Sequence, residues 1–85
     1  MDDHAWNIYP NPNDGNFTIN FVSTVDESIE LRIVNAIGEI VEQRSLRVHA
    51  GSQQFTMDKG RITAGVYHVV IMTNKGVGTK KLVVR

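Results

Sequence analysis

NAIGEIV, at residues 35–41, decides how the rest of the chain is interpreted. Apolar residues flank the stretch on both sides, but Asn35 and Gly38 interrupt the apolar pattern. The stretch is therefore a broken core helix, a glycine loop that holds a ligand, or a tight turn between two strands. The pattern of the flanking segments distinguishes these three alternatives.

The segments around this stretch alternate between apolar and polar residues. Before it, Ile29, Leu31 and Ile33 alternate with charged residues. The same period of two recurs in four more segments, at residues 17–21, 54–57, 67–71 and 81–84. A period of two with β-branched and aromatic residues is typical of half-buried strands, and no window has the spacing of an amphipathic helix. The sequence predicts an all-β chain.

In an all-β chain, residues 35–38 must connect two strands as a hairpin turn. Asn35 suits the first turn position because its side chain can bond the backbone two residues on. Gly38 suits the position of positive φ at which such loops close with a bulge. A phosphate-binding loop would need a helix N-terminus after the glycine, whereas a strand follows here. The stretch is therefore predicted to be a turn.

Turn-forming residues divide the rest of the chain into strands. Pro10 and Pro12 lack an N–H, so the segment that contains them cannot be a strand inside a sheet. The sequence TNKG predicts a second hairpin, and a crossover loop is expected near residues 59–65. Seven strands are predicted, near residues 6–9, 15–22, 28–35, 39–49, 52–58, 65–73 and 77–85.

Seven short strands in 85 residues predict a seven-stranded immunoglobulin-like antiparallel β-sandwich. Tyr67, near the start of a late strand, matches the tyrosine corner of sandwich domains. We expect residues 8–85 to form the only domain, and residues 1–7 to be a leading linker that includes some residues of the first strand. No apolar run reaches the roughly 18 residues of a membrane span, so membrane insertion is not expected. No signal peptide precedes Asp2, so an export signal would belong to sequence outside this chain.

The apolar members of the alternating sets predict the core between the two sheets. Side chains on one face of each strand should meet the facing sheet, because successive side chains point to opposite faces. The predicted core residues are Phe17, Ile19, Phe21, Leu31, Ile33, Phe55, Tyr67, Val69 and Ile71.

The ionisable residues give little support for catalysis or metal binding. The chain has no cysteine, which excludes disulfides, thiolate chemistry and cysteine-based zinc sites. His4, His49 and His68 are widely separated, and no helix brings two of them together. Asp2, Asp3 and His4 would suit a metal, but terminal residues are more often disordered. We expect no enzyme activity, no cofactor and no metal.

Charge is unevenly distributed along the chain, although the formal net charge is zero. Residues 1–58 contain all nine acids and three arginines, a charge of −6, and residues 59–85 contain six basic residues and no acid, a charge of +6. Pairing of oppositely charged strands within one fold would explain this distribution. The alternative is a basic C-terminal strand that meets an acidic partner. Nucleic acid is not an expected partner, because aromatic residues are not interleaved with the basic ones and the pI is about 6.8.

Three segments resemble a known family: IYPNPNDGNFTINF at residues 8–21, LRIVNAIGEIVEQRSL at residues 31–46, and ITAGVYHVVIMTNKGVGTKKLVVR at residues 62–85. Together they resemble the C-terminal sorting domain of the bacterial type IX secretion system. The resemblance covers nearly the whole chain, from residue 8 to residue 85. Asn35 departs from the Asp that family members often have before the central turn, but both residues support such a turn.

The family pattern assigns structural roles to five residues. Its domain opens with a Pro-Asn-Pro element, which corresponds here to Pro10 and Pro12. A strand–turn–strand unit with Gly38 follows, and then a Gly-Val-Tyr element with Gly65 and Tyr67. A lysine-rich strand ends the pattern.

The resemblance implies a non-catalytic sorting signal that follows a cargo domain in an exported protein. The expected partners are the type IX translocon and its shuttle proteins, and a sortase-like peptidase that removes the domain afterwards. The cargo would cross the periplasm and would then be released or attached at the cell surface.

Residues 76–85, with the sequence GVGTKKLVVR, are the predicted recognition segment. A strand of small and basic residues is a candidate exposed edge, which a receptor can engage by strand addition or charge and which a second copy can engage to form a homo-oligomer. Alternatively, the lysines only protect an edge strand from aggregation. The resemblance favours recognition, and the predicted residues are Lys80, Lys81, Leu82, Val83, Val84 and Arg85. The alternative function is a fibronectin-like or immunoglobulin-like module that binds carbohydrate or protein.

Overall fold

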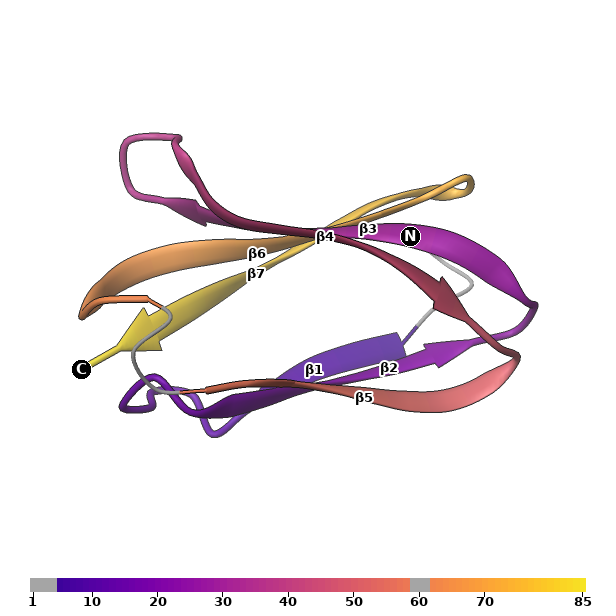
Figure 1. The fold of residues 1–85 in the computed structure, drawn as a ribbon, viewed down its shortest axis with the longest axis horizontal. Coiled ribbons are helices and arrows are strands. Elements are labelled where there is room, and N and C mark those ends of the chain that lie inside the picture. Colours follow the sequence, from indigo (N-terminus) through magenta and orange to yellow (C-terminus); the bar gives the residue numbers. More distant parts are fainter. Residues whose placement is uncertain (1–4, 59–61) are drawn as a thin grey trace.

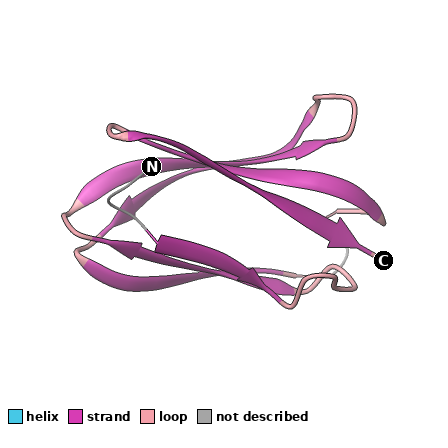
Figure 2. Cartoon of the chain, turned by 180° about the vertical axis from the view of Figure 1, so that it is seen from behind, coloured by secondary structure: helices cyan, strands magenta, loops and turns pink. Residues whose placement is uncertain are grey.

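A computed structural model of the chain describes residues 5–58 and 62–85. Within these residues every regular element is a strand (Figure 2). The described part of the chain therefore contains no helix that is long and apolar enough to cross a membrane. The seven strands are β1 (Ala5–Tyr9), β2 (Phe17–Ser23), β3 (Glu27–Asn35), β4 (Ile40–Val48), β5 (Gly51–Met57), β6 (Gly65–Thr73) and β7 (Gly76–Val84).

The strands form two antiparallel sheets that pack face to face (Figure 1). One sheet has three strands in the order β1–β2–β5, and the other has four in the order β4–β3–β6–β7. This arrangement confirms the predicted immunoglobulin-like sandwich. The predicted strand limits agree with the observed ones to within two residues, and β1 begins at Ala5, one residue before its predicted start.

Side chains from the inner faces of both sheets form one hydrophobic core. Eight of the nine predicted core residues are buried, and only Phe55 is half-buried, because it lies on β5 at the edge of the three-stranded sheet. The core also includes Leu82 and Val84 of the terminal strand, whose side chains are 0% and 4% exposed. The buried apolar residues are Phe17, Ile19, Phe21, Ile29, Leu31, Ile33, Val48, Met57, Ile62, Tyr67, Val69, Ile71, Leu82 and Val84.

The prediction that oppositely charged strands pair is wrong for the terminal strand. β7 pairs with β6, and no residue of β6 is acidic. Charged residues form ion pairs within one strand instead: Arg32 Nε lies 2.6 Å from Glu30 Oε1 on β3, and Arg44 Nε lies 3.9 Å from Glu42 Oε1 on β4. The lysines of β7 therefore face no acid on the strand beside them.

Candidate functional site

Four segments that are distant in the sequence meet at one end of the sandwich, on the left in Figure 1. They are the loop after β1, the hairpin loop between β3 and β4, the start of β6 and the end of β7. Each contains one of the motifs that the sequence analysis singled out. We call this end the motif end; it comprises residues 10–16, 35–39, 62–67 and 81–85.

Asn35 organises the hairpin loop between β3 and β4. Its Oδ1 accepts hydrogen bonds from the N–H groups of Ile37 at 3.1 Å and Glu39 at 2.9 Å. Its backbone C=O accepts a hydrogen bond from the Gly38 N–H at 3.0 Å. Gly38 has a φ of +91°, where a β-branched side chain would be strained. Both roles predicted from the sequence are confirmed.

Tyr67 forms a tyrosine corner at the start of β6. Its hydroxyl donates a hydrogen bond to the Thr63 C=O at 2.7 Å and lies 3.2 Å from the Thr63 Oγ1. Gly65 packs against this ring: a Cβ placed on Gly65 would lie 3.5 Å from the Tyr67 ring, at ordinary van der Waals distance. The geometry gives both Gly65 and Tyr67 a structural role.

Asn11 and Asn13 occupy the outer edge of β7. The Asn11 Nδ2 donates a hydrogen bond to the Lys81 C=O at 2.8 Å, and its Oδ1 accepts one from the Val83 N–H at 3.0 Å. The Asn13 N–H donates to the Val83 C=O at 3.0 Å, and its C=O accepts from the Arg85 N–H at 2.8 Å. We call these four hydrogen bonds the asparagine clasp.

The Asn13 side chain holds the loop of the clasp in shape. This buried side chain donates a hydrogen bond from Nδ2 to the Pro10 C=O at 2.9 Å and accepts one at Oδ1 from the Gly15 N–H at 2.9 Å. Pro10 and Pro12, which lack an N–H, alternate with the two asparagines that bond β7. Sequence reasoning identified the prolines but missed the asparagines, because a contact across about seventy residues leaves no local pattern.

The clasp corrects the expectation of an exposed edge along the terminal strand. Between Lys81 and Arg85 that edge is hydrogen-bonded to the loop after β1, so a receptor or a second copy could add a strand there only by displacing the clasp. Leu82 and Val84 lie in the core. The structure therefore places residues 80–84 on one strand, with Arg85 directly after it, but gives these residues different environments.

The two lysines of the predicted recognition segment lie on opposite faces of β7. The Lys80 Nζ lies 5.3 Å from the centre of the Trp6 ring on β1, a cation–π contact that links the two sheets. Lys81 lies opposite His68 of β6, and both side chains are exposed on the outer face of the four-stranded sheet. Lys81 is thus the lysine that presents its charge on this face.

The titratable residues do not converge on a second site in the described part of the chain. His49 Nδ1, in the β4–β5 loop, lies 4.0 Å from Asp26 Oδ2, in the β2–β3 loop, and both side chains are mostly exposed. Figure 1 shows these two loops at the end opposite the motif end. Within residues 5–58 and 62–85, no three His, Cys, Asp or Glu side chains are close enough together to hold a metal ion. Asp2, Asp3 and His4 lie outside the described residues.

Comparison with known proteins gives one match that spans almost the whole chain. A family model described as "secretion system C-terminal sorting domain" matches residues 7–85, which include all four segments of the motif end. No curated protein matches the chain.

Proposed function

Because the chain belongs to the family of type IX secretion C-terminal sorting domains, we propose that it directs an attached cargo through the outer-membrane translocon and is then cleaved from it. Domains of this family act with the type IX machinery on exported proteins destined for the outer membrane or cell surface, and they are non-catalytic in general. The match over residues 7–85 is the observation that supports this proposal most strongly.

The finer steps of the proposal follow from the family resemblance. Shuttle proteins would receive the domain during transit through the periplasm, and a sortase-like peptidase would remove it. The cargo would then be released or attached at the cell surface. The domain itself would have no catalytic role and no cofactor. The alternative of a fibronectin-like binding module has no support from the family match.

We place recognition at the terminal strand, on residues 80–85. Two features support this placement: the strand is basic, and its second half is hydrogen-bonded on both edges, to β6 on one side and to the loop after β1 through the clasp on the other. Lys81 and Arg85 have exposed side chains that can meet a partner, and Lys80 contributes from beside Trp6. Leu82, Val83 and Val84 would act mainly by fixing the strand's position, because two of them are buried and Val83 is half-buried.

A reporter export assay tests this proposal. The chain is fused behind a reporter with an ordinary signal peptide, in a host with type IX machinery. We expect the wild-type fusion to reach the cell surface and Lys81→Glu to leave the reporter in the periplasm. Arg47→Glu is the matched control, because Arg47 is also exposed on an edge strand of the same sheet.

Two outcomes would overturn different parts of the proposal. A wild-type fusion that stays in the periplasm would contradict the sorting function. Equal surface levels for the two charge variants would contradict recognition through the charge of Lys81. Deletion of residues 80–85 is not a clean test, because it removes Leu82 and Val84 from the core.

A further inference from the structure

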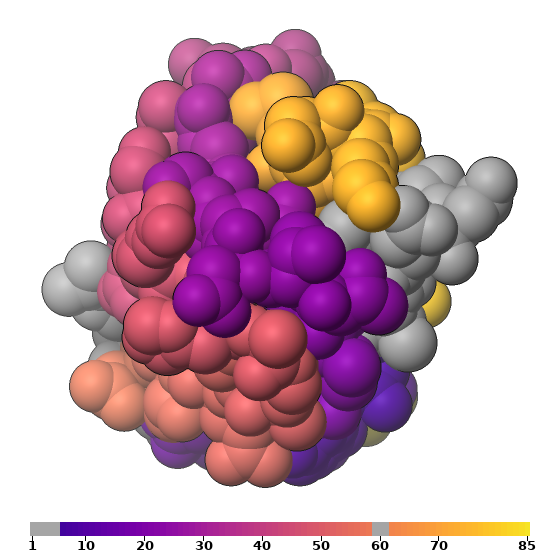
Figure 3. Space-filling view, turned by 90° about the vertical axis from the view of Figure 1, so that its right-hand side faces the viewer, coloured from indigo at the N-terminus to yellow at the C-terminus, as the bar shows by residue number. Residues whose placement is uncertain are grey.

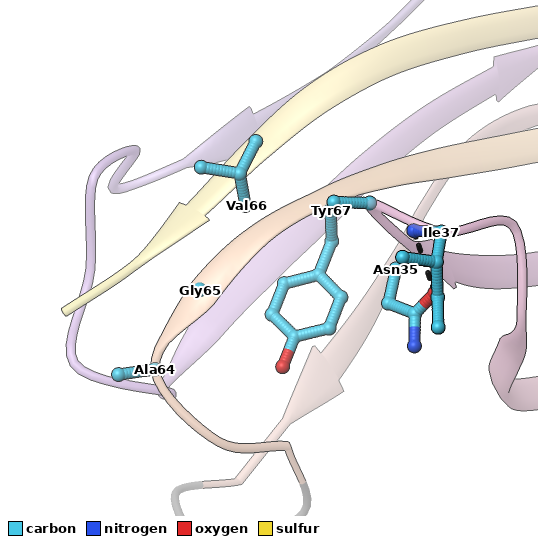
Figure 4. A pocket seen from close by; sticks show the side chains of 7 residues that line it. Asn35, Ile37, Ala64, Gly65, Val66 and Tyr67 are labelled. Carbon is cyan, nitrogen blue, oxygen red and sulfur yellow. Dashed lines mark hydrogen bonds between the residues drawn. The ribbon is translucent and has the colours of Figure 1, made fainter.

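A hollow of about 280 Å³ lies at the motif end, between the β3–β4 hairpin loop and the start of β6 (Figure 4). We propose that it binds one apolar side chain of an extended segment from a partner protein. In so far as that partner belongs to the export machinery, the inference rests on the proposed function. The hollow is lined by Asn35, Ala36, Ile37, Ala64, Gly65, Val66 and Tyr67.

The chemistry of the lining favours a neutral, apolar ligand group. None of the seven lining residues has a charged side chain, and the hydroxyl of Tyr67 already donates its hydrogen to Thr63. Ile37 is 80% exposed, the largest exposed fraction among the large apolar side chains of the described residues. A partner's apolar group in the hollow would shield Ile37 from water.

The walls of the hollow are fixed before any ligand arrives. On one side, the hairpin loop is held by hydrogen bonds that Asn35 accepts from the N–H groups of Ile37, Gly38 and Glu39. The bond from Tyr67 to the crossover segment holds the other side. The volume lies just below the usual range of about 300–1,000 Å³ for small-molecule pockets, so one side chain is a better fit than a cofactor.

The orientation of the Val66 backbone is the reason to expect an extended ligand segment. The ladder between β3 and β6 ends with the pair Asn35–Tyr67, and Val66, one residue beyond, pairs with Val83 on the other side. Because the N–H and C=O of Val83 both face the clasp, Val66 and Val83 are a non-hydrogen-bonded pair. The backbone groups of Val66 therefore point away from β7, toward the side of the hollow.

Figure 4 agrees with this orientation. The Val66 side chain points away from the ring of Tyr67, so Val66 borders the hollow through its backbone. An extended partner segment could accept a hydrogen bond from the Val66 N–H while its side chain contacts Ile37 and Tyr67. Main-chain bonding with a pocket for one side chain is the usual form of recognition by strand addition.

A titration followed by nuclear magnetic resonance tests the hollow directly. The isotope-labelled 85-residue chain is titrated with the capped tripeptide acetyl-Ser-Leu-Ser-amide, and acetyl-Ser-Ser-Ser-amide is the control peptide. We expect the leucine peptide to shift the amide signals of Ile37, Gly65 and Val66 saturably, and the serine peptide to leave them unchanged. Ile37→Ser should weaken binding about tenfold, because it removes an apolar contact.

The matched control for this variant is Val77→Ser, at the other end of β7. Val77 is 57% exposed, so its replacement removes a similar apolar group from the surface without touching the hollow. It should bind the leucine peptide as tightly as the wild type. Absence of shifts with the leucine peptide, or equal shifts with both peptides, would overturn the proposal. Shifts at the hollow on concentrating the chain alone would also overturn it, since the occupant would then be a second copy.

The reporter export assay separates this inference from the proposed function. We expect Ile37→Ser to lower the surface level of the reporter at least threefold and Val77→Ser to leave it unchanged, a difference of about 0.7 kcal/mol or more. If the wild type is exported and both variants give the same surface level of the reporter as the wild type, then the partner does not belong to the export machinery. The proposed sorting function would still hold. If the wild type is not exported, the sorting function fails, and the peptide titration alone decides whether the hollow binds an apolar side chain.

Discussion

β7 has two halves in different environments. In the second half, residues 81–84, Leu82 and Val84 are buried in the core and the clasp bonds the outer edge. In the first half, residues 76–80, no side chain is buried. The hairpin that this half forms with β6 rises away from the three-stranded sheet at the right of Figure 1 and lies on the surface in Figure 3.

The contrast between the two halves bears on how the strand can be recognised. An unprotected edge strand exposes a row of backbone groups that other chains can pair with. In the second half of β7 the clasp uses those groups, so only side chains on the outer face remain for a partner. The first half contains small residues and a lysine, and the clasp does not cover its edge. The basic strand is therefore part of the folded sandwich and not a tail added to it.

The largest expected effect tests the buried half. Leu82→Ala should lower the free energy of unfolding by about 2–5 kcal/mol, because it leaves a cavity in the core. For so small a domain this is a large part of the total stability. Urea denaturation followed by circular dichroism measures the loss. A loss below about 0.5 kcal/mol, as expected for a surface position, would mean that β7 does not face the core as described.

The next effect tests the clasp. Asn13→Ala should cost about 1–3 kcal/mol, because it leaves the Pro10 C=O and the buried Gly15 N–H without their partners. Asn13→Asp keeps the acceptor for Gly15 but places a carboxylate oxygen against the Pro10 C=O in a buried position, so it should also be destabilising. Hydrogen exchange of the Arg85 amide should also become faster in Asn13→Ala. Unchanged exchange would contradict a clasp that depends on this side chain.

A smaller effect tests the boundary between the two halves, at Lys80. Lys80→Met keeps most of the length of the side chain and removes the charge above Trp6, so the cost should be about 0.5–1 kcal/mol. A double-mutant cycle with Trp6→Leu isolates the contact. If the two single costs simply add, the lysine and the ring do not interact.

The smallest effect tests the exposed half. Val77→Thr should change the free energy of unfolding by less than about 0.5 kcal/mol, because the side chain is more than half exposed and lies far from the clasp. Thermal unfolding of Val77→Thr and Leu82→Ala, measured side by side, compares how much each half of β7 contributes to stability. A cost near that of Leu82→Ala would remove the distinction between them.

Much of the fold could be predicted because its signals are local. The hairpin turn depends on Asn35 and Gly38, whose partners lie within four residues. The strands depend on a period of two, which is visible in any short window. The tyrosine corner at Tyr67 was predicted for the same reason, since its partner Thr63 is four residues away.

The candidate site was predicted only in part. The motifs around Pro10, Gly38, Gly65 and the terminal strand were identified, but the sequence did not predict that they lie close together. The clasp joins Asn11 to Val83, and the hollow joins Ile37 to Gly65. Such contacts depend on which strands become neighbours, and a single sequence does not contain that information in any local pattern.

The sequence by itself determined the all-β class, the central turn and the resemblance to a sorting domain, because each rests on short-range periodicity or on ordered motifs. Only the tertiary structure decided which groups of the basic C-terminal strand are exposed to a partner. Its alternation favours the face of Leu82 and Val84 toward the core, and packing against the three-stranded sheet fixes Leu82 inward and Lys81 outward. The edge of that strand is closed by a loop that only the folded sandwich brings beside it.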